Sequence, residues 1–238
     1  MVLGVIPARL NSSRFPKKIL APLLGKPMIA HVVERVLDAK NLDKVILAID
    51  NHETEEALKD YNFDIMMTSD KHLSGTDRIA EVAKKLNQAR VIINIQGDEP
   101  LVDPKIIDDL VNVFLDKNVE MATVLSKDLS VEDLIDLNVV KAVIDEKFNA
   151  INFKREIFDM EIGGLYRHIG MYGFRREALF HFTSLPLSKS EKKYNLEQLR
   201  AIENGIMIKA IITNYPHFSV DTKKDLNKIK NIMGLINE

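Results

Sequence analysis

Residues 2–50 read VLGVIPARLNSSRFPKKILAPLLGKPMIAHVVERVLDAKNLDKVILAID, and the order of patterns within them sets the type of sheet. Short apolar runs at residues 2–8 and 44–50 are typical of strands buried in a parallel sheet. Between them, residues 27–40 carry apolar side chains at helical spacing and open with a proline, which the first turn of a helix tolerates. A strand, a helix and a second strand in this order predict a crossover unit.

The same alternation continues along the chain. Apolar runs predict strands at residues 64–69, 91–97 and 120–126, with helices at 53–61, 76–88 and 103–117. The second half is less regular and predicts strands at 139–145, 150–155, 166–175 and 207–213, a helix at 193–205 ended by Gly205, and a C-terminal helix capped by Asp221 or Thr222. We therefore predict an α/β fold with a mostly parallel, Rossmann-like sheet flanked by helices and a smaller, more antiparallel segment.

The composition excludes several classes of protein. Lysine and arginine (33) nearly balance aspartate and glutamate (35), so no overall basic field would draw the chain to nucleic acid. Cysteine is absent, which excludes disulfides, thiol catalysis and cysteine-bound zinc and fits a reducing compartment. No apolar run reaches the roughly 18 to 20 residues that span a bilayer, and no secretory signal is evident. We expect a cytoplasmic protein without membrane insertion.

Polar clusters follow the predicted strands, where ligands bind in parallel sheets. The first cluster holds Arg9, Ser12, Arg14 and Lys18, and such a loop between a strand and a helix can bind an anion. A solvated basic surface is the alternative. The chain has no G-x-x-x-x-G-K-[ST] motif, which argues against a P-loop ATPase.

Two further clusters and one distant carboxylate complete the candidate site. Residues 69–78 include Ser74, Gly75 and Arg78, where a tight turn offers backbone donors, although an ordinary capped turn would look the same. Residues 94–100 run from the end of a strand into an acidic pair, Asp98 and Glu99. Such a pair suits a Mg²⁺ ion that also binds phosphate oxygens. An exposed turn is the alternative. Asp221 offers a second metal ligand or a helix cap.

Taken together, the motifs IPAR, SGTDR, NIQGDEP, FKR, RHIGMYGF, LEQLR and VDT resemble in order and spacing those of the CMP-Kdo synthetases, the 3-deoxy-manno-octulosonate (Kdo) cytidylyltransferases. The resemblance extends from about residue 2 to about residue 230. It implies a single nucleotidyltransferase domain over 1–238, with a CTP-binding part at 1–125, a sugar-binding and dimerisation part at 126–215, and a metal loop and C-terminal helix at 216–238. It also implies CTP and an acidic eight-carbon sugar as substrates, Mg²⁺ as cofactor, a homodimer, and CMP-Kdo made for lipopolysaccharide synthesis.

The resemblance implies roles for individual residues. Catalytic roles fall to Arg9, Lys18, Asp98 and Asp221, of which Asp98 and Asp221 hold the metal. CTP binding falls to Arg9, Ser12, Lys18, Ser74, Gly75 and Arg78. Sugar binding falls to Arg14, Gln96, Arg155, His168, Glu197 and Gln198. Arginine with His, Gln and Glu is a suitable set for a sugar that carries a carboxylate and many hydroxyls.

Departures from the family pattern affect the expected identity of the sugar substrate more than the expected use of CTP. Lys17 and Ile19 replace a usual glycine and proline, Lys154 replaces a serine, and the segment that follows Arg155 lacks an Ile-Pro. A modified ulosonate such as 8-amino-Kdo, or another acidic sugar, is therefore an alternative acceptor, and a catalytically silent sugar-nucleotide binder is the alternative outside enzymes. His168 as a structural histidine and an ion pair between Arg155 and Glu197 are further alternatives.

Overall fold

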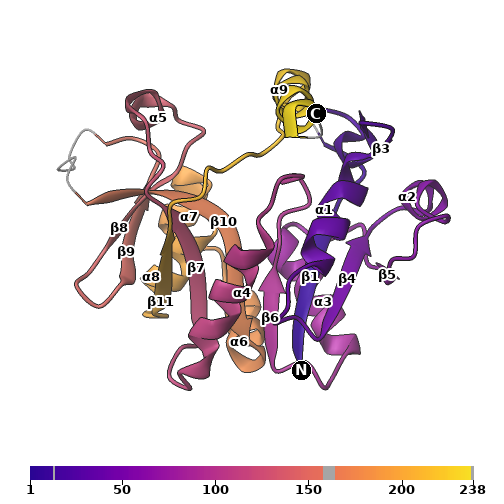
Figure 1. Ribbon diagram of the computed structural model, residues 1–238. Coiled ribbons are helices and arrows are strands. Elements are labelled where there is room, and N and C mark those ends of the chain that lie inside the picture. Colours follow the sequence, from indigo (N-terminus) through magenta and orange to yellow (C-terminus); the bar gives the residue numbers. More distant parts are fainter. Residues whose placement is uncertain (13, 158–163, 237–238) are drawn as a thin grey trace. The chain divides into compact units, whose positions relative to one another are not determined.

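The computed structural model describes residues 1–12, 14–157 and 164–236 (Figure 1). The chain divides into two compact units. Unit 1 comprises Met1–Asp108 and Phe218–Glu238, and unit 2 comprises Asp109–His217. The functional parts predicted from the sequence, with boundaries after residues 125 and 215, remain a prediction.

Unit 1 is built on four parallel strands in the order β5-β4-β1-β6. Their bounds are Ile65–Met67 for β5, Lys44–Ile49 for β4, Val2–Ala8 for β1 and Val91–Asn94 for β6. The helices are α1 (Met28–Leu37), α2 (His52–Ala57), α3 (Gly75–Lys85) and α9 (Lys223–Ile236), with α4 (Pro104–Asn112) crossing into unit 2. A 3₁₀ turn, η1 (Lys18–Leu20), and a small hairpin of β2 (Pro22–Leu23) and β3 (Lys26–Pro27) join β1 to α1.

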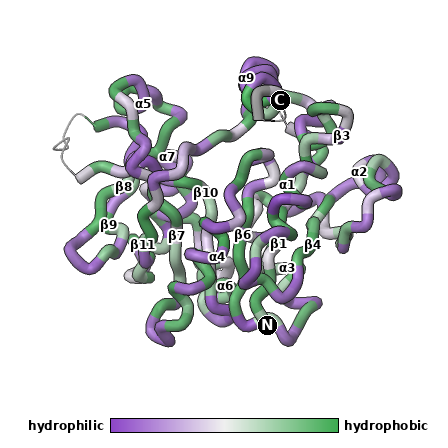
Figure 2. The backbone as a smooth tube through the Cα atoms, viewed as in Figure 1, coloured by the Kyte–Doolittle hydropathy of each residue, from purple (hydrophilic) through white to green (hydrophobic). Residues whose placement is uncertain are grey.

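This arrangement follows from the apolar runs seen in the sequence. Leu3, Val5 and Ile6 of β1 have no exposed surface, as expected for a strand with neighbours on both sides. Figure 2 shows the strands of unit 1 coloured mostly as hydrophobic. Because the four strands are parallel, the loops that follow them leave from the same edge of the sheet. The sheet thereby gathers the polar clusters of unit 1.

Unit 2 contains a mixed set of strands in the order β10-β7-β11-β9-β8. Strand β7 (Met121–Ser126) is antiparallel to β10 (Leu165–Arg175) and parallel to β11 (Ile208–Thr213). Strand β9 (Asn149–Lys154) is antiparallel to β11 and to β8 (Lys141–Ile144), and β8 also pairs with β10. The mostly parallel sheet predicted from the sequence is found in unit 1 but is not confirmed for the chain as a whole, because the strands of unit 2 are mixed. The more antiparallel segment predicted for the second half corresponds to the antiparallel pairings of β8, β9 and β10.

The helices of unit 2 also differ from the prediction. They are α5 (Val131–Ile135), α6 (Arg176–Ser184), α7 (Lys189–Tyr194) and α8 (Gln198–Glu203), with the 3₁₀ turn η2 (Val113–Leu115) after α4. The single helix predicted at 193–205 is two helices, because Asn195 adopts the left-handed conformation (φ +52°) and ends α7. Ser188 caps α7 through a reciprocal bond pair with Glu191, so this helix begins before the predicted start.

Within the described residues, no helix is long and apolar enough to cross a membrane.

Candidate functional site

Lys18 lies between the two carboxylates that the sequence singled out in unit 1. Its Nζ is 2.7 Å from Asp98 Oδ2 and 3.4 Å from Asp221 Oδ1, and its side chain is only 12% exposed. Arg14 approaches the same Asp221 oxygen at 2.9 Å. Four predicted site residues from three distant parts of the sequence therefore meet in one charged cluster.

The C-terminal helix brings Asp221 to this cluster. Val220 is fully buried, and its N–H donates to the Asp98 carbonyl at 2.9 Å. The cap of α9 is Thr222, whose Oγ1 accepts from the Asp225 N–H while the Asp225 carboxylate accepts from the Thr222 N–H. Because Thr222 and not Asp221 provides the cap, the Asp221 carboxylate is left to contact Arg14 and Lys18.

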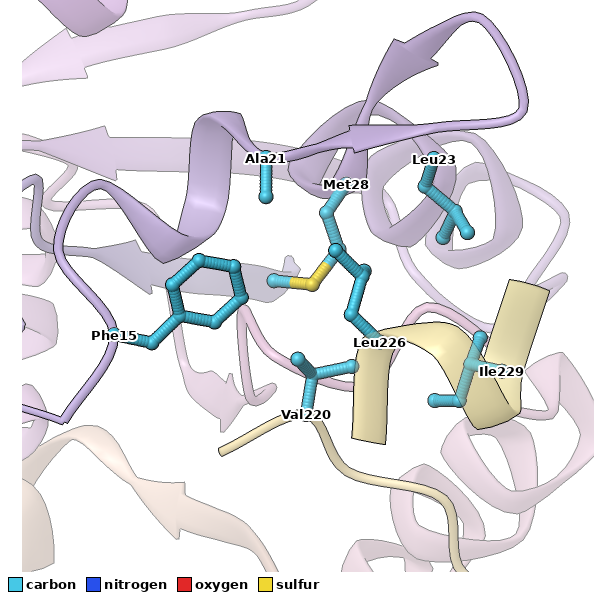
Figure 3. Close-up of a cluster of buried hydrophobic side chains, with 7 residues drawn as sticks. All are labelled: Phe15, Ala21, Leu23, Met28, Val220, Leu226 and Ile229. Atoms are coloured by element: carbon cyan, nitrogen blue, oxygen red, sulfur yellow. The ribbon is translucent and has the colours of Figure 1, made fainter. Parts of the chain in front are cut away.

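A hydrophobic cluster, the α9 cluster, fixes this placement. It consists of Phe15, Ala21, Leu23, Met28, Val220, Leu226 and Ile229. Figure 3 shows these side chains pointing toward one another from the segment that joins β1 to α1, from the start of α1, and from α9 with the residues just before it. Phe15 lies between Arg14 and the Lys17–Lys18 pair in sequence. Its burial therefore fixes the path of the basic loop, the segment from Arg9 to Lys18. Packing in the α9 cluster therefore fixes both the loop that carries Arg14 and Lys18 and the segment that carries Asp221.

Gly97 places Asp98 close to β1. A Cβ atom at Gly97 would lie 3.1 Å from the Pro7 carbonyl oxygen and 3.2 Å from Ile29 Cδ1. The glycine therefore allows the segment after β6 to approach the end of β1, where the basic loop begins. Gln96, two residues before Asp98, is partly exposed on the same segment.

Arg9 and Ser12 lie on the loop that follows β1, and both are partly buried. The Arg9 Nη2 atom is buried and makes no hydrogen bond within the described part of the chain. A buried guanidinium nitrogen without a partner is costly, and an anionic ligand would satisfy it. This observation suits the phosphate role expected for Arg9.

Ser74, Gly75 and Arg78 form the first turn of α3. Ser74 is the N-cap, since its Oγ accepts from the Asp77 N–H while Asp77 accepts from the Ser74 N–H. Arg78 is fully buried, and its Nη1 and Nη2 donate to Thr68 Oγ1 at 2.6 Å and to Asp50 Oδ2 at 3.0 Å. Desolvation by burial lowers the pKa of Arg78, and Asp50 acts in the opposite direction.

In unit 2, His168 of β10 packs between the ring of Phe153 on β9 and that of Tyr172 on β10. Its ring lies 4.9 Å from Phe153 and 5.4 Å from Tyr172, and its Nε2 is 3.2 Å from Thr123 Oγ1. Burial lowers the pKa of His168 to about 3, with a further effect from His217, so the ring is neutral at neutral pH. Burial also raises the pKa of Tyr172, and nearby Glu197 adds to this effect. His168 and Glu197 therefore both lie near Tyr172.

Arg155 is tied to backbone carbonyls. Its Nη1 donates to the Leu137 carbonyl at 2.8 Å, and Nε and Nη2 donate to Tyr194 and Asn195 at 3.3 and 3.4 Å. Glu197 has its Oε1 3.7 Å from Arg200 Nη2. Arg155 thus holds the α7–α8 connection that leads to the Glu197–Gln198 pair, which is a positioning contact.

Gln198 is 5% exposed, and its Nε2 is buried without a hydrogen-bond partner among the described residues. A buried amide with an unmet donor suits contact with a sugar oxygen. The predicted sugar residues thus divide between the units, with Arg14 and Gln96 in unit 1 and the other four in unit 2. The segment after Arg155 differs from the family pattern, and part of it, residues 158–163, lies outside the described residues.

Comparison with known proteins decides the family. The Cytidylyltransferase family model matches residues 3–211. A 3-deoxy-manno-octulosonate cytidylyltransferase from Thermodesulfovibrio yellowstonii is 41% identical, over 93% of this chain and 94% of the relative. One of the same name from Solibacter usitatus is also 41% identical, over 97% and 94%. This chain belongs to the 3-deoxy-manno-octulosonate cytidylyltransferases. A solved structure of CMP:2-keto-3-deoxy-manno-octonic acid synthetase complexed with CTP agrees, with a TM-score of 0.92, 34% identity and coverage of 98% of each chain.

Lys17 is one of the departures from the family pattern, and its backbone geometry accounts for the glycine expected there. Lys17 adopts φ +54°, a left-handed conformation that glycine adopts at little cost. A glycine is the residue expected at this position in the family. In this chain the lysine also contacts Glu53 of α2, with Nζ 2.5 Å from Oε1. The turn before Lys18 is therefore kept despite the substitution.

The sequence places Asp50 after a predicted strand, at the edge of the sheet where ligands bind, but assigns it no role. Its carboxylate contacts the basic loop through the Leu10 N–H at 3.0 Å and α3 through Arg78. Thr222 and Asp225, which free Asp221 from capping, carried the S/T-x-x-D/E signature of a helix start.

Proposed function

We propose that this chain transfers the CMP group of CTP to 3-deoxy-manno-octulosonate, giving CMP-Kdo and pyrophosphate for lipopolysaccharide synthesis. The observation that carries the proposal is the convergence of Lys18 on Asp98 and Asp221 in a member of this family. Relatives about 40% identical over nearly the whole chain bear the name of this activity, and the 34% identical structure was solved with CTP. Retention of these charged groups disfavours a silent binder.

In this reaction the anomeric hydroxyl oxygen of the sugar attacks the α-phosphorus of CTP. The bond from that phosphorus to the β-phosphate oxygen breaks, pyrophosphate leaves, and the hydroxyl proton passes to solvent. Arg9 and Lys18 neutralise the triphosphate, and the buried Nη2 of Arg9 supplies a hydrogen-bond donor that is unused in the described chain. Positioning and charge neutralisation by these cations are the main contributions of the protein to the rate.

Asp98 and Asp221 are the residues that would hold Mg²⁺. Their oxygens reach a common cation, the Lys18 ammonium, so both carboxylates can face one metal ion. No group of three or more acidic or imidazole side chains suited to a metal occurs in the described residues. Mg²⁺ commonly uses one or two carboxylates together with substrate phosphates, and when bound it stabilises the charge that develops on the phosphates.

Sugar recognition is proposed for Arg14, Gln96, His168, Glu197 and Gln198. The neutral His168 ring and the unmet donor of Gln198 suit hydroxyl groups, and Arg14 suits the carboxylate. For Arg155 the contacts with carbonyls support an indirect role through the α7–α8 connection. The homodimer and the cytoplasmic location remain predictions from the sequence.

The test is pyrophosphate release from CTP with three acidic sugars, each at several Mg²⁺ concentrations. We expect release with Kdo to exceed that with 8-amino-Kdo and with N-acetylneuraminate. Asp98→Asn and Asp221→Asn should each lower kcat at least about 100-fold and raise the Mg²⁺ concentration at half-maximal rate, because each removes a carboxylate charge from the metal and from Lys18.

Asp60→Asn is the matched control, since Asp60 is an exposed aspartate of the same unit outside the charged cluster. Its kinetics should equal those of the wild type. Preferred release with another sugar would overturn the choice of Kdo. An unchanged Mg²⁺ dependence in both active-site variants would overturn the metal role, and no release with any sugar would favour the silent binder.

A further inference from the structure

Asp50 joins two segments that the reaction requires. It follows β4 directly, and its carboxylate accepts from two donors of different segments. Oδ1 accepts from the Leu10 N–H at 3.0 Å, and Oδ2 accepts from Arg78 Nη2 at 3.0 Å. Leu10 follows Arg9 in the basic loop, and Arg78 lies in the first turn of α3 after Ser74 and Gly75.

Arg78 is built into the protein and does not face solvent. Its side chain is 0% exposed, whereas that of Asp50 is 12% exposed. Its Nη1 donates to Thr68 Oγ1, and the Thr68 hydroxyl in turn donates to the Ile49 carbonyl at 2.7 Å. The guanidinium thus has a fixed position from which it can orient the Asp50 carboxylate.

Asp50 also offsets the repulsion between the charges of Arg9 and Arg78. Arg9 and Arg78 lie close enough for the charge of Arg9 to lower the pKa of Arg78, and Asp50 opposes that effect. If the carboxylate were lost, Arg9 would face an uncompensated buried cation of the same sign. With the carboxylate present, the buried pair is neutral, and the charge of Arg9 remains for a ligand.

We propose that Asp50 is a positioning residue for the triphosphate of CTP, which it serves by holding the Leu10 N–H and neutralising Arg78 so that Arg9 is presented to the phosphates. The inference rests on the proposed function. It predicts that removing the Asp50 carboxylate weakens the binding of CTP and of pyrophosphate to the protein and leaves the binding of the sugar unchanged.

The experiment compares Asp50→Asn with the wild type and with Asp108→Asn. Asp108 is a matched control in unit 1, because its Oδ1 likewise accepts a backbone N–H from a distant segment, that of Asn41 at 2.8 Å. It contacts none of the residues assigned to CTP in the hydrogen bonds described here. KM for CTP, KM for Kdo, the melting temperature, and pyrophosphate affinity by calorimetry are measured for each protein.

We expect Asp50→Asn to raise KM for CTP and the Kd for pyrophosphate about tenfold or more, with KM for Kdo within about twofold of the wild type. Asp108→Asn should lower the melting temperature and leave these constants unchanged. If Asp50→Asn does not fold, Arg78→Lys retains the charge pair but cannot span both Thr68 and Asp50, and a rise of about threefold or more in both constants is expected.

Equal changes for CTP and Kdo, or a melting-temperature loss without a change in pyrophosphate affinity, would overturn the positioning role. Turnover by the wild type is a separate result: its absence refutes the proposed function. Pyrophosphate calorimetry still decides the role of Asp50 in that case, and failure of the wild type to bind pyrophosphate would overturn it.

Discussion

His168 couples protonation to folding at the scale of a single residue. Its ring is packed against Phe153 and Tyr172, and burial lowers its pKa to about 3. In the unfolded chain the pKa of histidine is near 6.5. Between these two values the unfolded state binds a proton that the folded state does not, so the stability contribution of this site falls as the pH falls.

We predict that His168→Gln removes part of the acid sensitivity of folding. From about pH 7.5 to about pH 5, the wild type should lose about 2 kcal/mol of unfolding free energy more than this variant does, since the variant has no proton to bind here. Urea denaturation at several pH values measures the difference. His52→Gln, at a position where the histidine is 87% exposed, should follow the wild type; a His168→Gln curve parallel to the wild type would contradict the prediction.

Gly97 is a second single residue on which both stability and the position of Asp98 depend. A Cβ atom at this position would lie 3.1 Å from the Pro7 carbonyl oxygen and 3.2 Å from Ile29 Cδ1, so glycine leaves room for both. We predict that Gly97→Ala lowers the unfolding free energy by about 1 to 3 kcal/mol, because the Pro7 backbone has to shift, and also lowers kcat/KM through the displaced Asp98.

Gly234→Ala is the control for that substitution. Gly234 lies within α9, and among the described residues no atom outside its chain neighbours and the adjacent helix backbone is within 4 Å of the position its Cβ would take. Alanine there should leave the activity unchanged and raise stability by up to about 1 kcal/mol, as helix propensity requires. Equal effects of both substitutions on kcat/KM would show that space at Gly97 does not matter.

At the scale of elements, α9 is the feature on which the charged cluster depends. Leu226 and Ile229 anchor the helix in the α9 cluster, and Val220 just before it bonds to the Asp98 carbonyl. Figure 1 shows this yellow helix beside the indigo segment around β3, which joins β1 to α1. Anchoring of the helix and placement of Asp221 are therefore one structural event.

We predict that Ile229→Ala costs about 2 to 5 kcal/mol of stability, from the lost apolar burial and the cavity that remains. It should also raise the Mg²⁺ concentration needed for half-maximal rate, because Asp221 loses its support. Thermal unfolding and a Mg²⁺ titration check the two effects. Lys228→Ala, at an exposed position of the same helix, should change neither; an Ile229→Ala protein with wild-type stability would mean that α9 is not anchored through this residue.

At the scale of the whole molecule, local patterns predicted unit 1 better than unit 2. The alternation of apolar strands and amphipathic helices over residues 2–97 is enough to specify four parallel strands. In unit 2, β7 pairs antiparallel with β10 and parallel with β11, a choice set by contacts between distant segments. The less regular second half did indicate a more antiparallel segment, but apolar runs look alike in either pairing, so periodicity could not predict that β7 pairs antiparallel with one neighbour and parallel with the other.

The candidate site shows the same limit. Lys18 and Asp221 are 203 positions apart, and the residues alone left Asp221 as either a metal ligand or a helix cap; the family resemblance favoured the metal ligand. The buried Arg78–Asp50 pair escaped prediction because arginine is ordinarily an exposed residue. Polar residues after strands were found from position alone, whereas their partners required the fold.

As a 3-deoxy-manno-octulosonate cytidylyltransferase, this chain should form a bond between CMP and Kdo. Phosphorus-31 NMR of the protein with CTP, Kdo and Mg²⁺ tests this activity most directly. We expect the three CTP signals to be replaced by one phosphodiester signal and by pyrophosphate in equal molar amounts, with no change when Kdo is omitted. Conversion of CTP to free CMP, or unchanged CTP in the presence of Kdo, would contradict it.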